Sequence, residues 1–275
     1  MVINAFKMDG LGNDFIIIDC RDEKINLTKE QIIKLCDRSF LGCDQLILIY
    51  KSARSDAELI FYNSDGSESA ACGNGTRCVA YLISKEANKK IINLSTKSGN
   101  LDSKILGLNL VETRIGQAKT SWMEIPISRD INTKNLGLEI QDRKGNILKG
   151  GTAVNVGNPH TVFFIDDLNK FNLEKIGPTL ENNNLFPERC NITLAKVENR
   201  KKISVKVWER GAGLTKACGS AACATAFAAK INNLIDNDVE IGFELGNLSI
   251  KVDDKDFVKM KGPVSDIKEI EIKLK

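Results

Sequence analysis

The feature that most constrains the fold of this 275-residue chain is an internal repeat. Four landmarks recur in the same order, and the second copy of each lies 145 to 147 residues after the first. The pairs are Gly12-Asn13 with Gly157-Asn158, Tyr62-Asn63 with Trp208-Glu209, Ala71–Asn74 with Ala217–Ser220, and Gly99-Asn100 with Gly246-Asn247. We infer that the chain consists of two halves of one ancestral fold. Such halves can face each other across a cleft and present equivalent residues from opposite sides.

Short apolar, β-branched runs predict a chain that is rich in strands and has few helices. The expected strands cover 14–19, 45–50, 57–62, 161–165 and 202–208. Thr28 and Gln31 have the spacing of a capping box, which predicts a helix that ends at about Arg38. Two more helices are expected directly after the Ala-Cys-Gly tripeptides, over 74–86 and 220–231. Polar residues and glycine are frequent over 126–150, where a domain crossing could lie.

The composition is typical of a globular protein, with 42% hydrophobic and 27% charged residues. A formal net charge of +3 gives no indication of nucleic acid or a membrane as partner. No apolar run approaches the roughly 20 residues that a membrane span needs. The first ten residues lack the apolar core of a signal peptide, so we expect a cytoplasmic protein.

The cysteines and the histidine content argue against both a disulfide framework and a metal site. Eight cysteines in a chain without a secretion signal are expected to be reduced thiols. Cys72 with Cys78, and Cys218 with Cys223, lack the CxxC spacing of zinc modules, and His160 is the one histidine. No metal is therefore expected.

The repeat gives two of the cysteines, Cys72 and Cys218, the same setting. Each precedes a predicted helix, where unpaired backbone N–H groups and the helix dipole favour an anion and lower a thiol pKa. The same N–H groups can hold a substrate carboxylate and the enolate-like charge that forms when its α-proton leaves. Two thiols on opposite faces of a carbon could remove a proton from one side and return one to the other. The remaining cysteines are expected to be small core residues, namely Cys20, Cys36, Cys43, Cys78, Cys190 and Cys223.

Several blocks of the sequence resemble the diaminopimelate epimerase family. They are KMDGLGNDF at 7–15, CDQL at 43–46, FYNSDGSESAACGNGTRC at 61–78, VGNPH at 156–160, FPERCN at 186–191 and ERGAGLTKACGSAAC at 209–223. The resemblance covers nearly the whole chain. It implies a pyridoxal-independent isomerase that converts LL- to meso-2,6-diaminopimelate in the synthesis of lysine and peptidoglycan precursors. No cofactor is expected, and Cys72 and Cys218 are the implied acid and base.

The resemblance also implies a substrate site and roles for individual residues. The family's substrate-binding positions fall on Asn13, Gln45, Asn63, Gly73, Asn74, Asn158, Asn191, Glu209, Arg210, Gly219 and Ser220. A diamino diacid is zwitterionic at both ends, so Arg210 can bind a carboxylate and Glu209 can pair with an ammonium. His160 and Glu209 match positions that tune the thiols, and we expect His160 to support the site without carrying the proton.

The implied fold is α+β, with two pseudo-symmetric domains, each a mixed, mostly antiparallel sheet curled around a central helix. We expect the first domain to contain residues 1–117 and a C-terminal strand over 264–275, and the second to contain 118–263. The resemblance allows a homodimer, and Lys268 stands near the position of a tyrosine that the family often has in its dimer contact.

Other functions remain open from the sequence. A proline or hydroxyproline racemase would use a similar thiol pair, but a small cyclic imino acid has no distal zwitterion for Glu209 and Arg210 to bind. A thiol redox protein could use Cys72 and Cys218 as a switchable disulfide. A ligand-binding module would keep the amides and Arg210 without needing either thiol.

Overall fold

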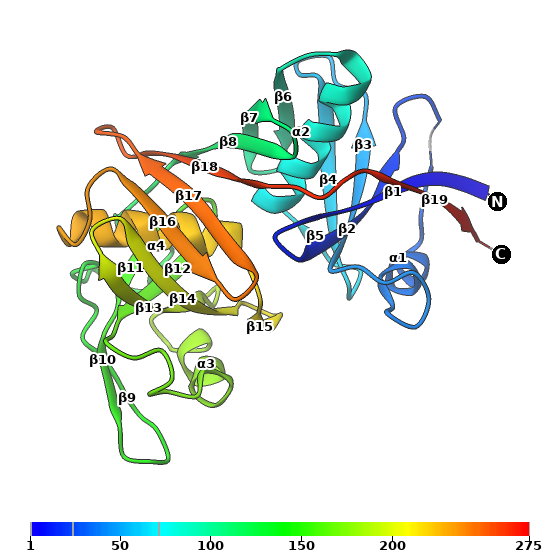
Figure 1. Cartoon of the computed structure of the whole chain (residues 1–275). Coiled ribbons are helices and arrows are strands. Elements are labelled where there is room, and N and C mark those ends of the chain that lie inside the picture. The colour runs from blue at the N-terminus through cyan, green and yellow to red at the C-terminus, as the bar shows by residue number, and fades with distance from the viewer. Residues whose placement is uncertain (1, 24, 71, 275) are drawn as a thin grey trace. The chain divides into compact units, whose positions relative to one another are not determined.

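The computed structural model describes residues 2–23, 25–70 and 72–274 of the chain (Figure 1). The chain divides into two compact units. Unit 1 is Met1–Arg114 with Lys261–Lys275, and unit 2 is Ile115–Met260. In each unit a mixed, mostly antiparallel sheet surrounds a central helix. The expected α+β fold with two similar halves is therefore confirmed.

Among the described residues, unit 1 carries two helices, the first eight strands, of which the eighth continues into unit 2, and the last strand. Its elements are β1 (Val2–Gly10), β2 (Asn13–Asp19), α1 (Lys29–Cys36), β3 (Gln45–Tyr50), β4 (Ala57–Asn63), β5 (Glu68–Ser69), α2 (Gly73–Ala87), β6 (Ile91–Thr96), β7 (Gly99–Gly107), β8 (Leu110–Gln117) and β19 (Lys268–Lys273). The predicted capping box of α1 is confirmed, because Thr28 Oγ1 accepts from Gln31 N at 3.3 Å and Gln31 Oε1 accepts from Thr28 N at 2.9 Å.

Unit 2 carries the remaining described strands, the last of which continues into unit 1, and two further described helices. Its elements are β9 (Leu138–Gln141), β10 (Ile147–Gly150), β11 (Thr152–Asn155), β12 (Pro159–Phe164), α3 (Leu173–Glu181), β13 (Asn191–Asn199), β14 (Lys202–Glu209), β15 (Gly213–Thr215), α4 (Gly219–Ile231), β16 (Asp238–Phe243), β17 (Gly246–Val252) and β18 (Phe257–Pro263). The five predicted strands correspond to β2, β3, β4, β12 and β14, and the predicted helices to α1, α2 and α4.

The two units share one order of strand pairings. In unit 1, β1–β2, β3–β4 and β6–β7 are antiparallel, whereas β2–β3 and β4–β6 are parallel. In unit 2, β11–β12, β13–β14 and β16–β17 are antiparallel, whereas β12–β13 and β14–β16 are parallel. Helices α1 and α3 occupy equivalent crossovers, and so do α2 and α4. The repeat inferred from the sequence is thus present in the fold.

The expectation of a domain crossing within 126–150 was wrong. This segment lies inside unit 2, where its polar residues form turns and the β9–β10 hairpin. Asp142 closes that hairpin by accepting hydrogen bonds from the backbone N–H groups of Lys144 and Asn146, each at 2.8 Å. Asn, Asp and Gly are frequent there because tight turns need them, and the same composition is typical of linkers.

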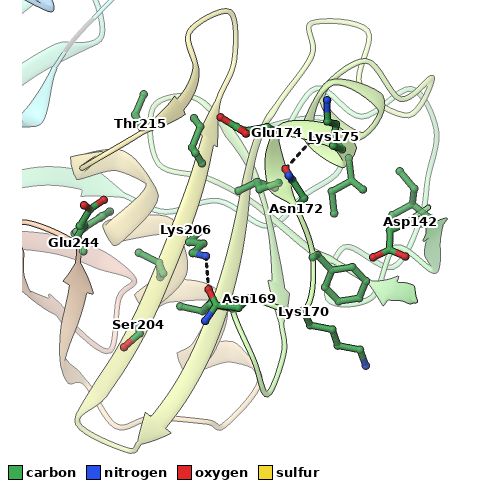
Figure 2. A pocket seen from close by; sticks show the side chains of 18 of the residues that line it. Asp142, Asn169, Lys170, Asn172, Glu174, Lys175, Ser204, Lys206, Thr215 and Glu244 are labelled. Carbon is green, nitrogen blue, oxygen red and sulfur yellow. Dashed lines mark hydrogen bonds between the residues drawn. The ribbon is translucent and has the colours of Figure 1, made fainter. Parts of the chain in front are cut away.

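Unit 2 also has an open groove of about 1260 Å³ (Figure 2). Its walls come from α3 and the loop before it, from β14, β15 and β16, and from the turn between β9 and β10. Lys206 Nζ donates across it to Asn169 Oδ1 at 2.8 Å. Neither Cys218 nor His160 lines this groove, whereas Thr215 does.

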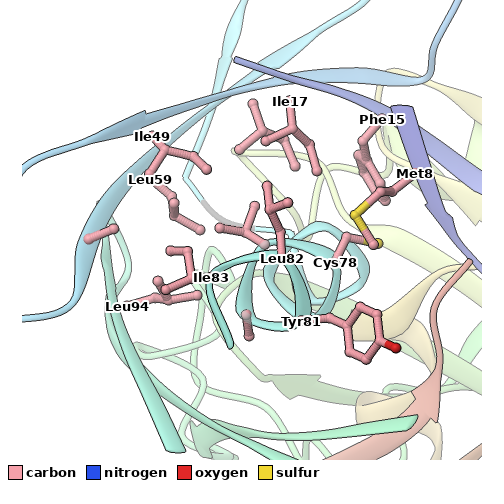
Figure 3. Close-up of a cluster of buried hydrophobic side chains, with 14 of the residues drawn as sticks. Met8, Phe15, Ile17, Ile49, Leu59, Cys78, Tyr81, Leu82, Ile83 and Leu94 are labelled. Atoms are coloured by element: carbon pink, nitrogen blue, oxygen red, sulfur yellow. The ribbon is translucent and has the colours of Figure 1, made fainter. Parts of the chain in front are cut away.

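Strands β2 and β3 of unit 1 are buried on both faces. Phe15 and Ile17 of β2 join a cluster of apolar side chains around α2 (Figure 3), whereas Ile16 and Ile18 join a second cluster under α1. The sequence of such a strand is a continuous apolar run without alternating polar residues, as it is in β2. The two clusters of apolar side chains, one on each face of the sheet, hold β2 and β3 in fixed positions.

The central helices are buried over most of their length. The buried residues are 74–84 in α2, and Gly219 with 221–229 in α4. Helix α2 contacts β1, β2, β6 and β7, and α4 contacts β11, β12, β13, β16 and β17. A helix enclosed on all sides needs no polar face, and the alanines of α4 allow neighbouring strands to approach closely. Among the residues that the structure describes, no helix is long and apolar enough to cross a membrane.

Candidate active site

Cys72 is the N-cap residue of α2. Its backbone is extended, with φ −142° and ψ 113°, and its carbonyl oxygen accepts the first helical hydrogen bond from Thr76 N at 2.8 Å. The Sγ atom accepts from Gly75 N at 3.5 Å. The first turn of α2, all of which is described, contains no acidic residue. The N–H groups and the dipole at this helix start therefore favour an anion.

Two amide side chains lie next to the Cys72 thiol. Asn13 Oδ1 accepts from Cys72 Sγ at 3.7 Å and from Asn74 Nδ2 at 3.2 Å. Asn13 Nδ2 donates to Asp44 Oδ2 at 3.0 Å, and this bond determines which end of the amide faces the thiol. The sequence analysis missed Asp44. It lies in the Cys-Asp-Gln-Leu block that carries part of the resemblance, which could have identified it.

Gln45 and Asn63 form a second pair of amides in unit 1. They lie opposite each other on β3 and β4, and Gln45 Nε2 donates to Asn63 Oδ1 at 2.9 Å. Among the described residues, Gln45 Oε1 and Asn74 Oδ1 are buried without a hydrogen-bond partner. Buried polar atoms are normally paired, so these two oxygens are available to a ligand that carries N–H donors.

Cys218 occupies the same position in unit 2 as Cys72 does in unit 1. It is the N-cap residue of α4, with φ −139° and ψ 114°, and its side chain is 6% exposed. Its Sγ atom lies 3.4 Å from Ser220 Oγ. The other six cysteines are buried core residues, as predicted.

Ser220 connects the Cys218 thiol to the single histidine. Its Oγ atom lies 3.1 Å from His160 Nε2 and accepts from Asn158 Nδ2 at 3.4 Å. His160 Nε2 also lies 2.9 Å from Asn158 Oδ1. Burial, with a smaller contribution from the Arg210 charge, lowers the pKa of His160 to about 3. The ring is therefore neutral at neutral pH, and it can orient Ser220 but is a poor proton donor there.

The buried neutral histidine predicts a specific loss of stability in acid. The unfolded chain binds a proton at His160 below its ordinary pKa of 6.5, whereas the folded chain does so only near pH 3. The free energy of unfolding therefore falls as the pH decreases through 6.5, by about 2 kcal/mol at pH 5. Urea unfolding at pH 7 and pH 5 should show that His160→Gln removes this part of the decrease. An equal decrease in the variant and the wild type would contradict the assignment.

The Cys218 thiol is buried and lies close to the Glu209 carboxylate. Burial, followed by the negative charge of Glu209 and a hydrogen bond to it, raises the pKa of Cys218 well above its ordinary value. The expectation of a lowered pKa at this helix start was therefore wrong for Cys218, because desolvation outweighs the helix N-terminus. Thr215 Oγ1 donates to Glu209 Oε1 at 2.5 Å and holds the carboxylate in place. The sequence analysis missed Thr215.

Arg210 follows Glu209 at the end of β14, and its position is fixed by two residues. Arg210 N donates to Asn191 Oδ1 at 3.0 Å, and Arg210 Nη1 donates to the carbonyl oxygen of Glu188 at 2.8 Å. Asn191 is 3% exposed and donates to the carbonyl oxygen of Pro159 at 2.9 Å. The buried amide thus ties the start of β13 to the end of β14.

The strand pairings gather the predicted residues at one sheet edge in each unit. Asn13 and Gln45 begin the parallel strands β2 and β3, and Asn63 ends the antiparallel β4. Asn158 precedes β12, Asn191 begins β13 and Glu209 ends β14 in the same arrangement. Gly73-Asn74 and Gly219-Ser220 begin the central helices. The roles given to these residues stay predictions. Among the described residues, no group of three or more His, Cys, Asp or Glu is placed to hold a metal ion.

Comparisons with known proteins show which family resembles the chain. The model of the diaminopimelate epimerase family matches residues 5–121 and 152–267. A diaminopimelate epimerase of Pelagibacter ubique (strain HTCC1062) is 64% identical over 274 residues and covers 100% of both chains. One of Acidiphilium cryptum (strain JF-5) is 41% identical over 260 residues, covering 94% of this chain and 92% of the relative.

A solved structure has the same fold. The hydroxyproline epimerase of Agrobacterium vitis, solved with bound trans-4-hydroxy-L-proline, has a TM-score of 0.71 and covers 98% of this chain and 92% of its own. Its sequence identity is 9%, so this likeness concerns the fold alone.

Proposed function

The chain belongs to the diaminopimelate epimerase family, and from this membership we infer that it is an isomerase that converts LL- to meso-2,6-diaminopimelate in lysine biosynthesis. The identity of 64% extends over the full length of the relative. The observation that carries the chemistry is the pair of cysteines, Cys72 and Cys218, at the same N-cap position of two equivalent helices.

We propose that these two thiols exchange protons with the substrate α-carbon. One cysteine, as thiolate, removes the α-proton and becomes a thiol. The other, as thiol, gives its proton to the opposite face and becomes a thiolate, so atoms and charges balance over the two steps. The proposal requires that both sulfurs reach one carbon. Because the pKa of Cys218 is raised, this thiol starts in the protonated form and needs Glu209 to accept its proton before it can act as a base.

The backbone at the two helix starts stabilises the charge that develops. The N–H groups of Gly73-Asn74 and of Gly219-Ser220 lie in the first turn of α2 and of α4. A carboxylate bound there also holds the enolate-like intermediate, because its oxygens take up the negative charge that remains when the α-proton leaves. No cofactor is needed for this step.

The polar groups at the sheet edges suit a zwitterion at each end of the substrate. Arg210 supplies a guanidinium for a carboxylate, and its backbone is fixed by Asn191. The buried oxygens of Gln45 and Asn74 have no hydrogen-bond partner among the described residues and can accept from an ammonium. The amides of Asn13, Asn63 and Asn158 can donate or accept as the bound end requires.

The cellular location and the oligomeric state belong to the same proposal. We propose a cytoplasmic enzyme, because eight cysteines and a thiol mechanism need a reducing compartment. Family resemblance also allows a homodimer, with Lys268 at the start of β19. A nucleic acid partner is not part of the proposal.

One experiment tests the reaction. The reduced protein, dialysed exhaustively against a chelator and given no pyridoxal phosphate, is incubated with LL-diaminopimelate in deuterated water. We expect meso-diaminopimelate that carries deuterium at the inverted carbon, because the returned proton comes from a thiol that exchanges with solvent. L-Proline and trans-4-hydroxy-L-proline should not be inverted. Activity that appeared only after adding metal or pyridoxal phosphate would contradict the cofactor-free mechanism.

A further inference from the structure

Glu181 is a buried carboxylate in an unfavourable place. It is the last residue of α3 and is 5% exposed. A helix C-terminus disfavours a negative charge, and the last turn of α3, which is described in full, has no basic residue. A buried anion persists only where donors satisfy it. The position of Glu181 therefore needs an explanation outside the helix.

Three donors satisfy the carboxylate, and all of them come from the region that carries Asn191, Glu209 and Arg210. Trp208 Nε1 donates to Oε2 at 2.7 Å, and Gly211 N donates to Oε1 at 3.0 Å. Arg189 Nη1 donates to Oε1 at 3.1 Å from a side chain that is 52% exposed. Glu181 thus accepts hydrogen bonds from the residue before and from the residue after the Glu209-Arg210 dipeptide.

Helix α3 holds Trp208 in a second way. A Cβ atom at Gly177 would lie 2.5 Å from Trp208 Cδ2, so only glycine allows the helix to pack this closely on the indole ring. Gly177 precedes Glu181 by four residues, which places both on one face of α3. The ring is therefore fixed by packing at one turn of the helix and by a hydrogen bond at the next.

The consequence concerns the backbone of the substrate-binding turn. Gly211 has φ +76°, a conformation that suits glycine, and its N–H group points to Glu181. Arg210 N donates to Asn191 Oδ1 at the preceding peptide. Two successive N–H groups of the turn are thus fixed by side chains from α3 and β13, and the direction of the Arg210 side chain follows from them.

We propose that Glu181 is a positioning residue for substrate binding, which fixes the turn at Trp208–Gly211 so that Arg210 is held ready for a substrate carboxylate. This inference rests on the proposed function. Glu181 acts through the turn and touches no substrate itself. Its loss should weaken binding of substrate and transition state alike, which raises KM and leaves kcat nearly unchanged.

The test compares Glu181→Gln with Arg189→Met. The glutamine keeps the shape but turns an N–H₂ group either toward Trp208 Nε1 or toward Gly211 N and Arg189 Nη1, so at least one charged hydrogen bond is lost. We expect KM for LL-diaminopimelate to rise about tenfold, the size of effect typical for such a bond, with kcat within about twofold. Arg189→Met removes an ion pair whose arginine is half exposed and which therefore contributes little, and it keeps the hydrogen bonds from Trp208 and Gly211, so it should keep the wild-type KM.

A spectroscopic measurement reports on the same contact without substrate. The chain has two tryptophans, so Trp208 can be followed alone in a Trp122→Phe background. Glu181→Gln should shift the emission of Trp208, and Arg189→Met should not. If Glu181→Gln failed to fold, Glu181→Asp, which keeps the charge but shortens the reach, carries the same expectations.

The outcomes separate this inference from the proposed function. An active wild type together with a wild-type KM in Glu181→Gln, even with a lowered thermal midpoint, would give Glu181 a purely structural role and overturn the inference. A wild type that fails to epimerise diaminopimelate would instead overturn the proposed function.

Discussion

Replacing either Cys72 or Cys218 with alanine is expected to abolish epimerisation. Each variant retains only one of these two thiols, and a single acid or base can act on only one face of the α-carbon. The loss should be at least about 10³-fold, within the range of effects seen when a general acid or base is removed. The measurement is the optical rotation or chiral chromatography of diaminopimelate after incubation with reduced protein.

The fold should survive both substitutions, with a small difference between them. Cys72 Sγ accepts a hydrogen bond from Gly75 N, so its loss costs α2 at most about 1 kcal/mol of capping energy. Cys78→Ala and Cys223→Ala are the matched controls, because they remove a buried thiol from the same two helices. These controls are expected to lose some stability and keep epimerase activity.

A half-reaction distinguishes lost chemistry from lost binding. An analogue of diaminopimelate with a good leaving group at the β-carbon is eliminated after deprotonation alone, so a single thiol is sufficient. Each alanine variant should eliminate one stereoisomer and fail to epimerise the normal substrate. Epimerisation at a near wild-type rate by either variant would overturn the two-thiol mechanism.

The fold could be predicted from the sequence mainly because it is repeated. Asn13 and Asn158, or Cys72 and Cys218, can be matched at nearly the same offset, and the two units do share one series of strand pairings. The apolar run at β2 was predicted to be a strand, but the sequence did not predict which elements cover its two faces. Its burial on both faces depends on α1 and α2, which pack on opposite sides of the sheet, and no local pattern contains that information.

Interactions between distant residues were the part that the sequence did not predict. The Cys218 pKa follows from burial and from Glu209, which outweigh the helix N-terminus that local reasoning used. Asp44 contacts Asn13 across 31 positions, and Glu181 contacts Gly211 across 30. Turn residues over 126–150 looked like a linker because hairpins and linkers share a composition. Each of these errors concerns a contact or context that only the folded chain defines.

Glu209→Gln is expected to lower kcat about 10²-fold although it makes the Cys218 thiolate easier to form. The negative charge of Glu209 raises the pKa of Cys218, so removing the charge must lower that pKa. If the thiolate population alone limited the rate, the variant would be more active at neutral pH than the wild type. We expect the opposite, because glutamine cannot accept the Cys218 proton when this residue has to act as the base.

Two measurements on the same samples decide between these effects. The first is the rate of alkylation of Cys218 by iodoacetamide, followed by mass spectrometry over a range of pH. As the pH is increased, this rate should begin to rise at a lower pH in Glu209→Gln than in the wild type. Epimerisation by the same protein should fall. Glu244→Gln, which removes an exposed carboxylate from the same unit, should change neither quantity. A Glu209→Gln variant that is alkylated at lower pH and also epimerises faster would show that Glu209 only suppresses the thiolate, and it would remove Glu209 from the proton-transfer chain.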